Sequence, residues 1–432
     1  MTAALESRDR FLAEFDRHGG TLPGPGRLRR EALDRFAALG FPARGQEEWR
    51  HTDVAPLTEI PFRLAAGTPN PHQFAGVARG PLRAFQIAFV DGRHAPTFSS
   101  IDGNPGVRIS SLASVLREDP GRVEPLLAKL AAFDRNPFAA LNTAFFHDGA
   151  LVRIPPGAPA GAPIHLLFIS SMHGEPYVTH PRILVEAGEG SQATIVESFL
   201  GPAGGVYFTN AVTEIAAADG ARLDYYKVQR EGVEAFHVAS MQARLGRDAS
   251  LTHHSISLGG RLARNDFAAA LQGPGAGVTL NGLYEVTGAQ HVDHHTLVDH
   301  AAPRGTSRET YKGILGGRSR AVFEGRIVVR PTAEKTDARQ INRNLLLSSE
   351  AAVHTRPQLE ILARDVRCKH GSTVGQLDPS LLFYLRSRGI GLEEARRILV
   401  HAFACEIIDQ VRLDAVRAQL GGCLGLMARG VA

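Results

Sequence analysis

Long hydrophobic runs are missing from this sequence, and its first residues do not predict a secretory leader. The first twenty residues carry charges throughout and contain no apolar core of the kind that signal peptides have. The most apolar short stretch, residues 164–169, is far too short to span a bilayer. These absences predict a cytoplasmic protein that does not enter a membrane.

Lysine and cysteine are both scarce. Only five of the 48 basic residues are lysine, and the arginines alternate with acids without a run of five like charges. The net charge of +4 therefore does not indicate a nucleic-acid-binding surface. The three cysteines, Cys368, Cys405 and Cys423, are odd in number and lack zinc-knuckle spacing, which excludes a disulfide framework and fits a reducing compartment.

Common catalytic motifs are absent as well. The sequence has no P-loop, no G-x-S-x-G, no H-E-x-x-H and no C-x-x-C. The glycine-rich stretch 273–277 has no helix signal after it, so we interpret it as a turn. The missing P-loop excludes a P-loop ATPase.

The first of three predicted regions, residues 1–146, is mostly helical. Apolar faces at 5–17 and 27–39 predict two helices, and helical patterns return at 110–118 and 122–131. Asn136 and Pro137 have the N-cap and N1 pattern of a short helix that runs through Phe145. Residues 41–110 are rich in proline and glycine, with one strand-like run at 85–90.

The middle region, residues 147–376, reads as short strands without helices. Strand-like runs include 193–198, 222–228, 278–286 and 320–329. Turn residues precede such runs at Gly190, Gly220, Asp248 and Gly275, about 27–30 residues apart. A β-sandwich or barrel fits the strands, but this period suits one coil of a β-helix, and the long helix-free stretch favours that solenoid.

The last region, residues 377–432, returns to helix. Asp378 and Pro379 start a helix that Gly389 ends, and a second helix starts near Leu392. The second helix has a wide apolar stripe that includes Leu399, Phe403 and Ile407. The stripe by itself indicates packing on the rest of the chain. Because a hairpin at the end of a solenoid has little of its own chain to pack against, the alternative is a docking surface for a partner.

Two groups of residues could bind metal. The first is rich in histidine, with carboxylates among the imidazoles, and is either a metal site or a set of hydrogen-bonded strand residues. Its members are His253, His254, His291, Asp293, His294, His295, Asp299 and His300. The second is Cys368-Lys369-His370, after the strand-like run 359–366: in an extended chain Cys368 and His370 share one face, but they would need further ligands from elsewhere.

A longer signature then appears around this pair. It consists of Lys335-Thr336-Asp337, residues 342–347, residues 357–360, residues 368–378 and residues 383–390, with His291 to His294, Asp299-His300 and residues 311–314 upstream. The sequence resembles the SufB/SufD family of iron–sulfur cluster assembly proteins over about residues 165–412, and more loosely before that through Glu48-Trp49-Arg50 and residues 89–93. Gly371 stands where SufB members usually carry an acid, so the resemblance is to the SufD branch.

This resemblance implies a mainly β fold, a right-handed parallel β-helix between a helical N-terminal region and a C-terminal helical domain. It implies a scaffold subunit that is not an enzyme by itself. This subunit would pair with a SufB-type scaffold, dock a SufC-type ABC ATPase and form a homodimer when isolated. The resemblance implies no stably bound cofactor. It implies a transient Fe–S cluster that is shared with the SufB-type partner, and it leaves open whether the assembled complex binds a flavin. His370 would help to hold the nascent cluster, with Cys368 beside it. The docking residues for the ATPase would be Leu381, Phe383, Tyr384, Leu385, Leu399, Phe403 and Ile407.

Under the resemblance, the histidine-rich segment 291–300 is expected to support the β-helix. The alternative function is a SufB-like core scaffold that accepts sulfur and builds the cluster itself; Gly371 and the shortage of cysteine argue against it. A β-helix enzyme acting on polysaccharide would need secretion and a groove of paired carboxylates, which the sequence does not suggest.

Overall fold

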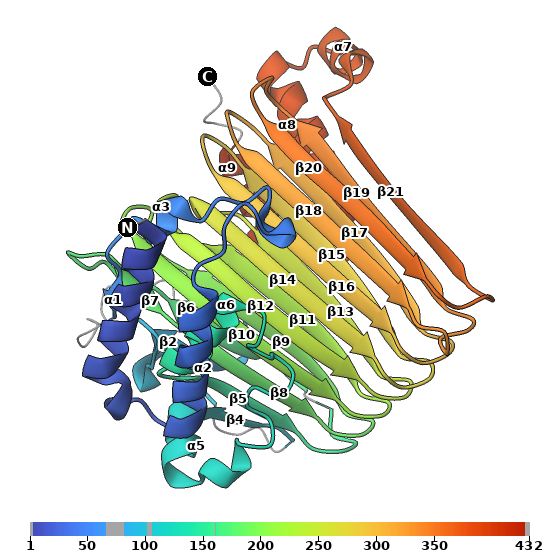
Figure 1. The fold of residues 1–432 in the computed structure, drawn as a ribbon. Coiled ribbons are helices and arrows are strands. Elements are labelled where there is room, and N and C mark those ends of the chain that lie inside the picture. The colour runs from blue at the N-terminus through green and yellow to red at the C-terminus, as the bar shows by residue number, and fades with distance from the viewer. Residues whose placement is uncertain (1–2, 66–81, 102–105, 160, 428–432) are drawn as a thin grey trace.

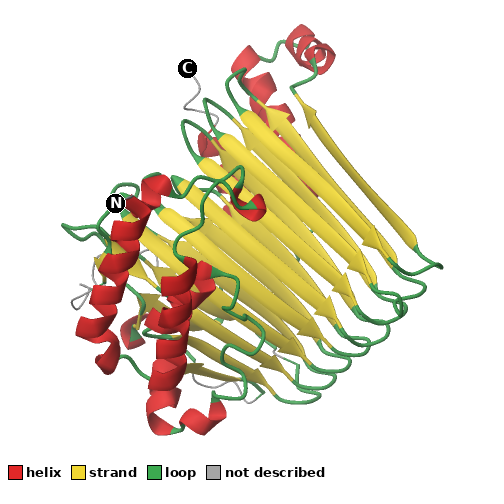
Figure 2. Cartoon of the chain, in the orientation of Figure 1, coloured by secondary structure: helices red, strands yellow, loops and turns green. Residues whose placement is uncertain are grey.

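The protein is a β-solenoid with helices at both ends of the chain (Figure 1, Figure 2). The structure, a computed structural model, describes residues 3–65, 82–101, 106–159 and 161–427. Two long sheets of parallel strands form the walls of the solenoid. The predicted fold class, a mainly β parallel β-helix flanked by helical regions, is confirmed.

Each coil of the solenoid contributes one strand to each sheet. The first sheet contains β4 (Arg108–Ser111), β5 (Gly149–Ile154), β8 (Arg182–Ala187), β10 (Tyr207–Ala217), β12 (Phe236–Leu245), β14 (Leu262–Leu271), β16 (His291–His300), β18 (Arg320–Val329) and β20 (Ala352–Ile361), with β1 (Arg63–Leu64) and β7 (Tyr177–Thr179) beside them. The second sheet contains β3 (Arg93–His94), β2 (Phe85–Val90), β6 (Ile164–Ile169), β9 (Gln192–Leu200), β11 (Arg222–Arg230), β13 (Ser250–Ser257), β15 (Gly277–Val286), β17 (Thr306–Leu315), β19 (Asp337–Leu346) and β21 (Arg367–Gly375).

The repeating turns of the sequence connect the coils as predicted. Gly190, Gly220 and Gly275 have φ of 64°, 69° and 77°, and Asp248 has φ of 52°, so all four adopt the left-handed conformation that Gly and Asp tolerate best. This common turn keeps the strands in register: Arg222 lies opposite Gln192 on one side and opposite Ser250 on the other. The period observed in the sequence is thus the length of one coil.

Inward-facing side chains fill the solenoid, because alternate residues of a strand point to opposite faces. Near the start of each strand of the second sheet they are apolar, as with Ile195, Leu223 and Leu251. Further along the same strands they become polar, as with Glu197 and Lys227, which are also buried. The interior therefore has an apolar half and a polar half.

The N-terminal helices cover the outer face of the first sheet at its early end (Figure 1). Phe36 and Phe138 from the helices pack in one cluster with Phe208 and Phe236 from the strands. The predicted cap at Asn136 is confirmed, since its side chain accepts hydrogen bonds from the N–H groups of two following residues, both at 3.0 Å. The helices are α1 (Ala3–His18), α2 (Gly26–Leu39), α3 (Ala55–Thr58), α5 (Leu112–Glu118) and α6 (Pro137–Phe145).

The helix predicted at 122–131 is wrong. A 3₁₀ turn at Pro120–Arg122 is followed by further turns, and Ala128 has φ of 58°. The buried carboxylate of Glu214, on the distant strand β10, accepts hydrogen bonds from the N–H groups of Ala128, Leu130 and Ala131. These long-range bonds satisfy backbone donors that a helix would otherwise satisfy locally.

The C-terminal helices differ from the prediction in number and packing. They are α7 (Pro379–Ser387), α8 (Leu392–Ile408) and α9 (Asp414–Met427), of which α9 was not predicted. Helix α8 packs on the outer face of the second sheet, where Val400, Ala404 and Ile407 join a cluster with Leu283 and Ile314. The reasoning that this hairpin has little of its own chain to pack against is therefore wrong for α8.

Candidate functional site

The last coil of the solenoid ends in an unpaired sheet edge. Within the described residues, β20 pairs only with β18, and β21 pairs only with β19. Ile361, Leu362 and Val374 are between 41% and 54% exposed there, although they are large and apolar. An edge of this kind is a template for strand addition by another chain.

The hydrogen-bonding groups of this edge follow from the ladder geometry. The N–H of Arg367 donates to the carbonyl of Thr336, so the odd-numbered residues of β21 face β19. Alternate residues of a parallel strand turn their N–H and C=O groups to opposite sides. Those of Cys368, His370, Ser372 and Val374 therefore point out of the edge. By the same logic Pro357 lies in β20 at an edge-facing position, where its missing N–H disrupts no bond within the sheet.

Cys368 and His370 share the inward-facing side of β21. They lie opposite Ala338 and Gln340 of β19, which are both buried in the interior. The run predicted at 359–366 is interrupted, because β20 ends at Ile361 and a loop precedes β21. Cys368 is half-buried against the core, whereas His370 is exposed because no further coil covers it.

The chemistry of this pair is that of a partial ligand set. Burial raises the pKa of the Cys368 thiol, so it is not an activated thiolate in the isolated chain. In the ranges that the structure covers, no group of three or more His, Cys, Asp or Glu side chains is arranged to hold a metal ion. A four-coordinate site at Cys368 and His370 would thus need ligands from another molecule.

The histidine-rich segment forms strand β16, and its side chains have structural contacts. Inside the solenoid, the His294 ring stacks on Tyr284 at 5.1 Å between centroids, and burial lowers the pKa of His294 to about 3. His300 lies 2.9 Å from the Ser307 hydroxyl, measured from Nε2 to Oγ. These contacts fit the expected role in the fold.

On the outer face of β16, Asp293 joins the N-terminal region to the solenoid. Its carboxylate accepts hydrogen bonds from the Thr52 hydroxyl at 2.5 Å and from Arg264 at 2.7 Å, and it lies 3.0 Å from His295. Burial alone would raise the pKa of Asp293, but His295 and Arg264 favour the charged carboxylate and hold this pKa far below its usual range.

The two adjacent histidines His253 and His254 also have structural contacts. The His253 ring stacks on Phe267, and the His254 ring stacks on Tyr226.

The sequence reasoning missed a buried polar network in the solenoid interior. Lys227 lies 2.9 Å from His237, which in turn lies 2.7 Å from Glu231, and Tyr225 donates to Glu197 at 2.5 Å. Burial lowers the pKa of Lys227 to about 8. The only signal in the sequence was that these polar residues occupy the alternate strand positions that face inward.

The polar network continues toward the open end through Glu309. Its carboxyl group accepts hydrogen bonds from Thr296 at 2.6 Å and from Gln340 at 2.7 Å. Burial raises the pKa of Glu309 to about 7. Glu309 lies opposite Gln340, and Gln340 lies opposite His370, so Glu309 is two strands behind the edge strand β21.

The structure divides the predicted docking residues into two groups. None of α7 is buried, and Leu381, Phe383 and Tyr384 are 50%, 75% and 55% exposed. In contrast, Ile407 is completely buried against the second sheet. The prediction that Ile407 lies on an accessible docking surface is therefore wrong for this chain.

The other residues of the predicted set are partly covered. Leu385 and Leu399 are half-buried. The Lys312 ammonium group lies 4.2 Å from the centroid of the Phe403 ring. The same ammonium group donates a hydrogen bond of 2.9 Å to the backbone carbonyl of Phe403. The accessible apolar residues thus lie mainly on α7, which extends past the end of the solenoid (Figure 1).

The two remaining cysteines belong to the C-terminal helices α8 and α9. Cys405 is a free thiol in α8, half-buried, whereas the side chain of Cys423 lies outside the described side chains. Among the helices in the described ranges, none has the length and apolar character to cross a bilayer.

Comparison with known proteins places these features in a family. Residues 168–403 match the family described as "SUF system FeS cluster assembly, SufBD core domain", and residues 25–166 match "SufBD protein N-terminal region". The chain is 32% identical to an iron–sulfur cluster assembly SufBD family protein of Synechocystis, covering 92% of this chain and 89% of the relative. It is 31% identical to the iron–sulfur cluster assembly protein SufD of Escherichia coli, covering 91% and 90%. The SufD of Bacillus subtilis is 26% identical, covering 73% and 72%.

Proposed function

Since this chain belongs to the SufBD family of iron–sulfur cluster assembly proteins, we propose that it is the SufD-type scaffold subunit of such an assembly, without catalytic activity of its own. In this proposal it works in the cytoplasm, pairs with a SufB-type scaffold and docks a SufC-type ATPase. The observation that carries it is the open edge of β21, where Cys368 and His370 share the inward-facing side of a strand that lacks a partner.

Pairing through this edge would complete the ligand set. A strand added to β21 would use the outward-pointing backbone groups between Cys368 and Val374 and would bring its own side chains next to His370. A nascent cluster would then be shared by the two subunits, with His370 and Cys368 on this side. Imidazole and thiolate both bind iron, and such a mixed set suits a site that must release its product.

Docking of the ATPase is assigned to α7 in this proposal. Phe383 and Tyr384 are large apolar side chains that the rest of the chain leaves exposed. Aromatic anchors of this kind carry much of the energy of protein interfaces. A homodimer of the isolated chain would use the same β21 edge, which is self-complementary about a two-fold axis. A flavin in the assembled complex is part of the proposal, without a site assigned in this chain.

The first experiment is an affinity pull-down of the tagged chain co-expressed with SufB- and SufC-type partners. Deletion of residues 379–432 would expose Leu283 and Ile314 under α8, so point substitutions are the cleaner test. Ser372→Pro removes an edge-facing N–H and should abolish recovery of the SufB-type partner, whereas the control Ser372→Thr keeps that N–H. Phe383→Ser should abolish recovery of the ATPase alone, with Arg386→Ser on the same helix as its control. Failure of the unmodified chain to recover either partner would refute the scaffold assignment.

The alternative, a SufB-like scaffold that builds the cluster itself, predicts a different result. Such a chain would accept sulfur from a cysteine desulfurase without any partner scaffold. The raised pKa of Cys368 disfavours this alternative, because the thiolate is the form that attacks a persulfide. Mass spectrometry of the isolated chain after incubation with a desulfurase and cysteine separates the two functions.

A further inference from the structure

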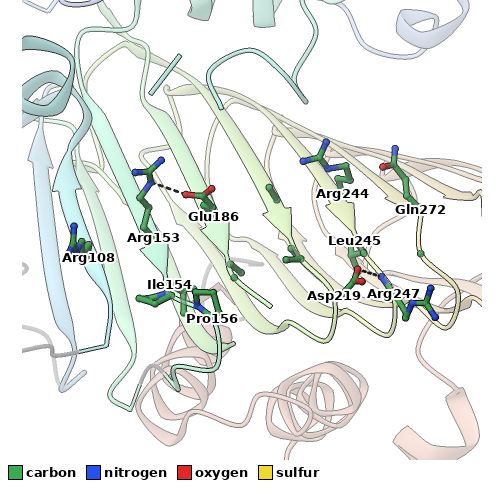
Figure 3. Close-up of a pocket in the computed structure, with 18 of the residues that line it drawn as sticks. Arg108, Arg153, Ile154, Pro156, Glu186, Asp219, Arg244, Leu245, Arg247 and Gln272 are labelled. Carbon is green, nitrogen blue, oxygen red and sulfur yellow. Dashed lines mark hydrogen bonds and ion pairs between the residues drawn. The ribbon is translucent and has the colours of Figure 1, made fainter. Parts of the chain in front are cut away.

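A hollow of about 720 Å³ lies on the outer face of the first sheet, far from the open end of the solenoid (Figure 3). Its volume is within the range of small-molecule sites, roughly 300–1,000 Å³. It is lined by residues of β4, β5, β8, β10 and β12 and by the turns that follow β5, β8, β10, β12 and β14. Its charged lining consists of Arg108, Arg122, Arg153, Arg244 and Arg247 with Glu186 and Asp219.

Strand register places the charged side chains in one row across the sheet. Arg108 lies opposite Arg153, Arg153 opposite Glu186, Glu186 opposite Ala216, and Ala216 opposite Arg244. Neighbouring strands are about 4.8 Å apart, so the backbones of Arg153 and Arg244 are about 15 Å apart. Ala216, the smallest side chain of the row, leaves the space in front of Arg244 open.

Both acidic residues of the hollow are already engaged. Glu186 forms an ion pair with Arg153 at 2.8 Å, and Asp219 accepts a hydrogen bond from the backbone N–H of Arg247 at 2.8 Å (Figure 3). Four guanidinium groups of the lining have neither a hydrogen bond nor an ion pair with any residue that the structure describes. They belong to Arg108, Arg122, Arg244 and Arg247.

Further along the outer face of the same sheet, two arginines are paired with acids. Arg264 pairs with Asp293 at 2.7 Å, and Arg326 pairs with Glu360. In the hollow, by contrast, Arg108 lies directly opposite another arginine, an arrangement of like charges that destabilises a sheet. Intramolecular contacts do not explain this concentration of positive charge, but an anionic ligand would.

We propose that this hollow binds a phosphate-bearing small molecule of nucleotide size. The planar guanidinium group matches phosphate oxygens in a bidentate manner, and Arg244 and Arg247 are free to do so. Pro155 and Pro156, exposed at the margin of the hollow, add apolar surface for the organic part of the ligand. This site is separate from the β21 edge and does not depend on the scaffold function.

Isothermal titration calorimetry of the full chain at low salt tests the site with ADP, inorganic pyrophosphate and adenosine as probes. ADP and pyrophosphate should bind, and adenosine should not. The double variant Arg244→Gln/Arg247→Gln should weaken both interactions on the order of tenfold or more. The matched control Arg222→Gln/Arg339→Gln removes two exposed arginines of the second sheet and should change the affinities less than about twofold.

The two phosphate sources give different patterns. Tighter binding of ADP than of pyrophosphate supports a nucleotide whose organic part uses the apolar margin, and equal affinities support an inorganic polyphosphate. The proposal is overturned if neither probe binds at millimolar concentration, or if both double variants lose affinity equally. Binding confined to an oligonucleotide or to phosphatidylglycerol vesicles overturns it as well. Circular dichroism of each variant establishes that it is folded.

Discussion

Replacing Glu309 by glutamine should make the stability of the protein less sensitive to pH. Glu309 is fully buried, and among the described residues the donors to its carboxyl group are Thr296 and Gln340, which are both neutral. A glutamine of the same shape can keep the bond from Thr296. The side-chain oxygen of Gln340 has no partner, so after rotation of its amide it can accept from the new amide group.

The magnitude follows from the pKa of Glu309, which burial raises from 4.5 to about 7. This difference corresponds to roughly 3 kcal/mol between the two protonation states. Below about pH 4.5 the group is protonated in the folded and unfolded chains alike, and ionisation has no effect on stability. Between pH 4.5 and 7 the unfolded chain loses its proton first, so the stability of the wild type falls, and above pH 7 the full loss is present.

Thermal unfolding of the wild type and Glu309→Gln at pH 5 and pH 8 measures this effect. With about 2.1 cal/mol/K of unfolding entropy per residue, roughly 3 kcal/mol corresponds to about 3 °C for this chain. The Tm of the variant minus that of the wild type should therefore increase by about 3 °C from pH 5 to pH 8. Glu350→Gln, an exposed control, should show no such increase. An unchanged difference, or a variant that is less stable at pH 8, would refute the reasoning.

Three further changes test the packing. Asp293→Ala should destabilise the protein by about 1.5–3 kcal/mol, because it removes one of the two carboxylates that pair with the buried Arg264 and leaves only Asp266. It also removes the bond to Thr52, so hydrogen exchange should show loosening of the N-terminal region first, and uniform protection would contradict this. Gly313→Ala should fail to fold stably, since its Cβ would lie 2.1 Å from the Tyr284 ring, and a normal yield and Tm would contradict the packing described. Asn136→Ala should cost about 1 kcal/mol through the lost N-cap, as measured by denaturation, and Asn136→Asp should retain most of the stability.

The parts of the fold that local signals control were predictable. The left-handed turns at Gly190 and Asp248 repeat once per coil, and the cap at Asn136 depends on its own neighbours in sequence. The region 120–131 was not predictable, because Glu214 on a distant strand binds its backbone donors. The packing of α8 depends likewise on an outer sheet face whose position the sequence does not reveal.

The candidate site was predictable only within one strand. Alternation along β21 was enough to place Cys368 and His370 on the same face. The location of that strand at the end of both sheets depends on the pairing of every coil before it, as does the position of Glu309 behind it. The row of arginines that includes Arg153 and Arg244 is also a product of cross-strand register, and these two residues are far apart in the sequence.

The unpaired last coil has a consequence for where the molecule opens. In a linear array each unit is stabilised by its neighbours, and a terminal unit has one neighbour instead of two. Strands β20 and β21 should therefore fray before any internal coil, and their amides should exchange fastest within the solenoid. A molecule that pairs with β21 would supply the missing neighbour and convert the coil from a terminal unit into an internal one. Assembly would thus rigidify the segment that carries His370 at the moment when the partner's side chains come to lie beside it.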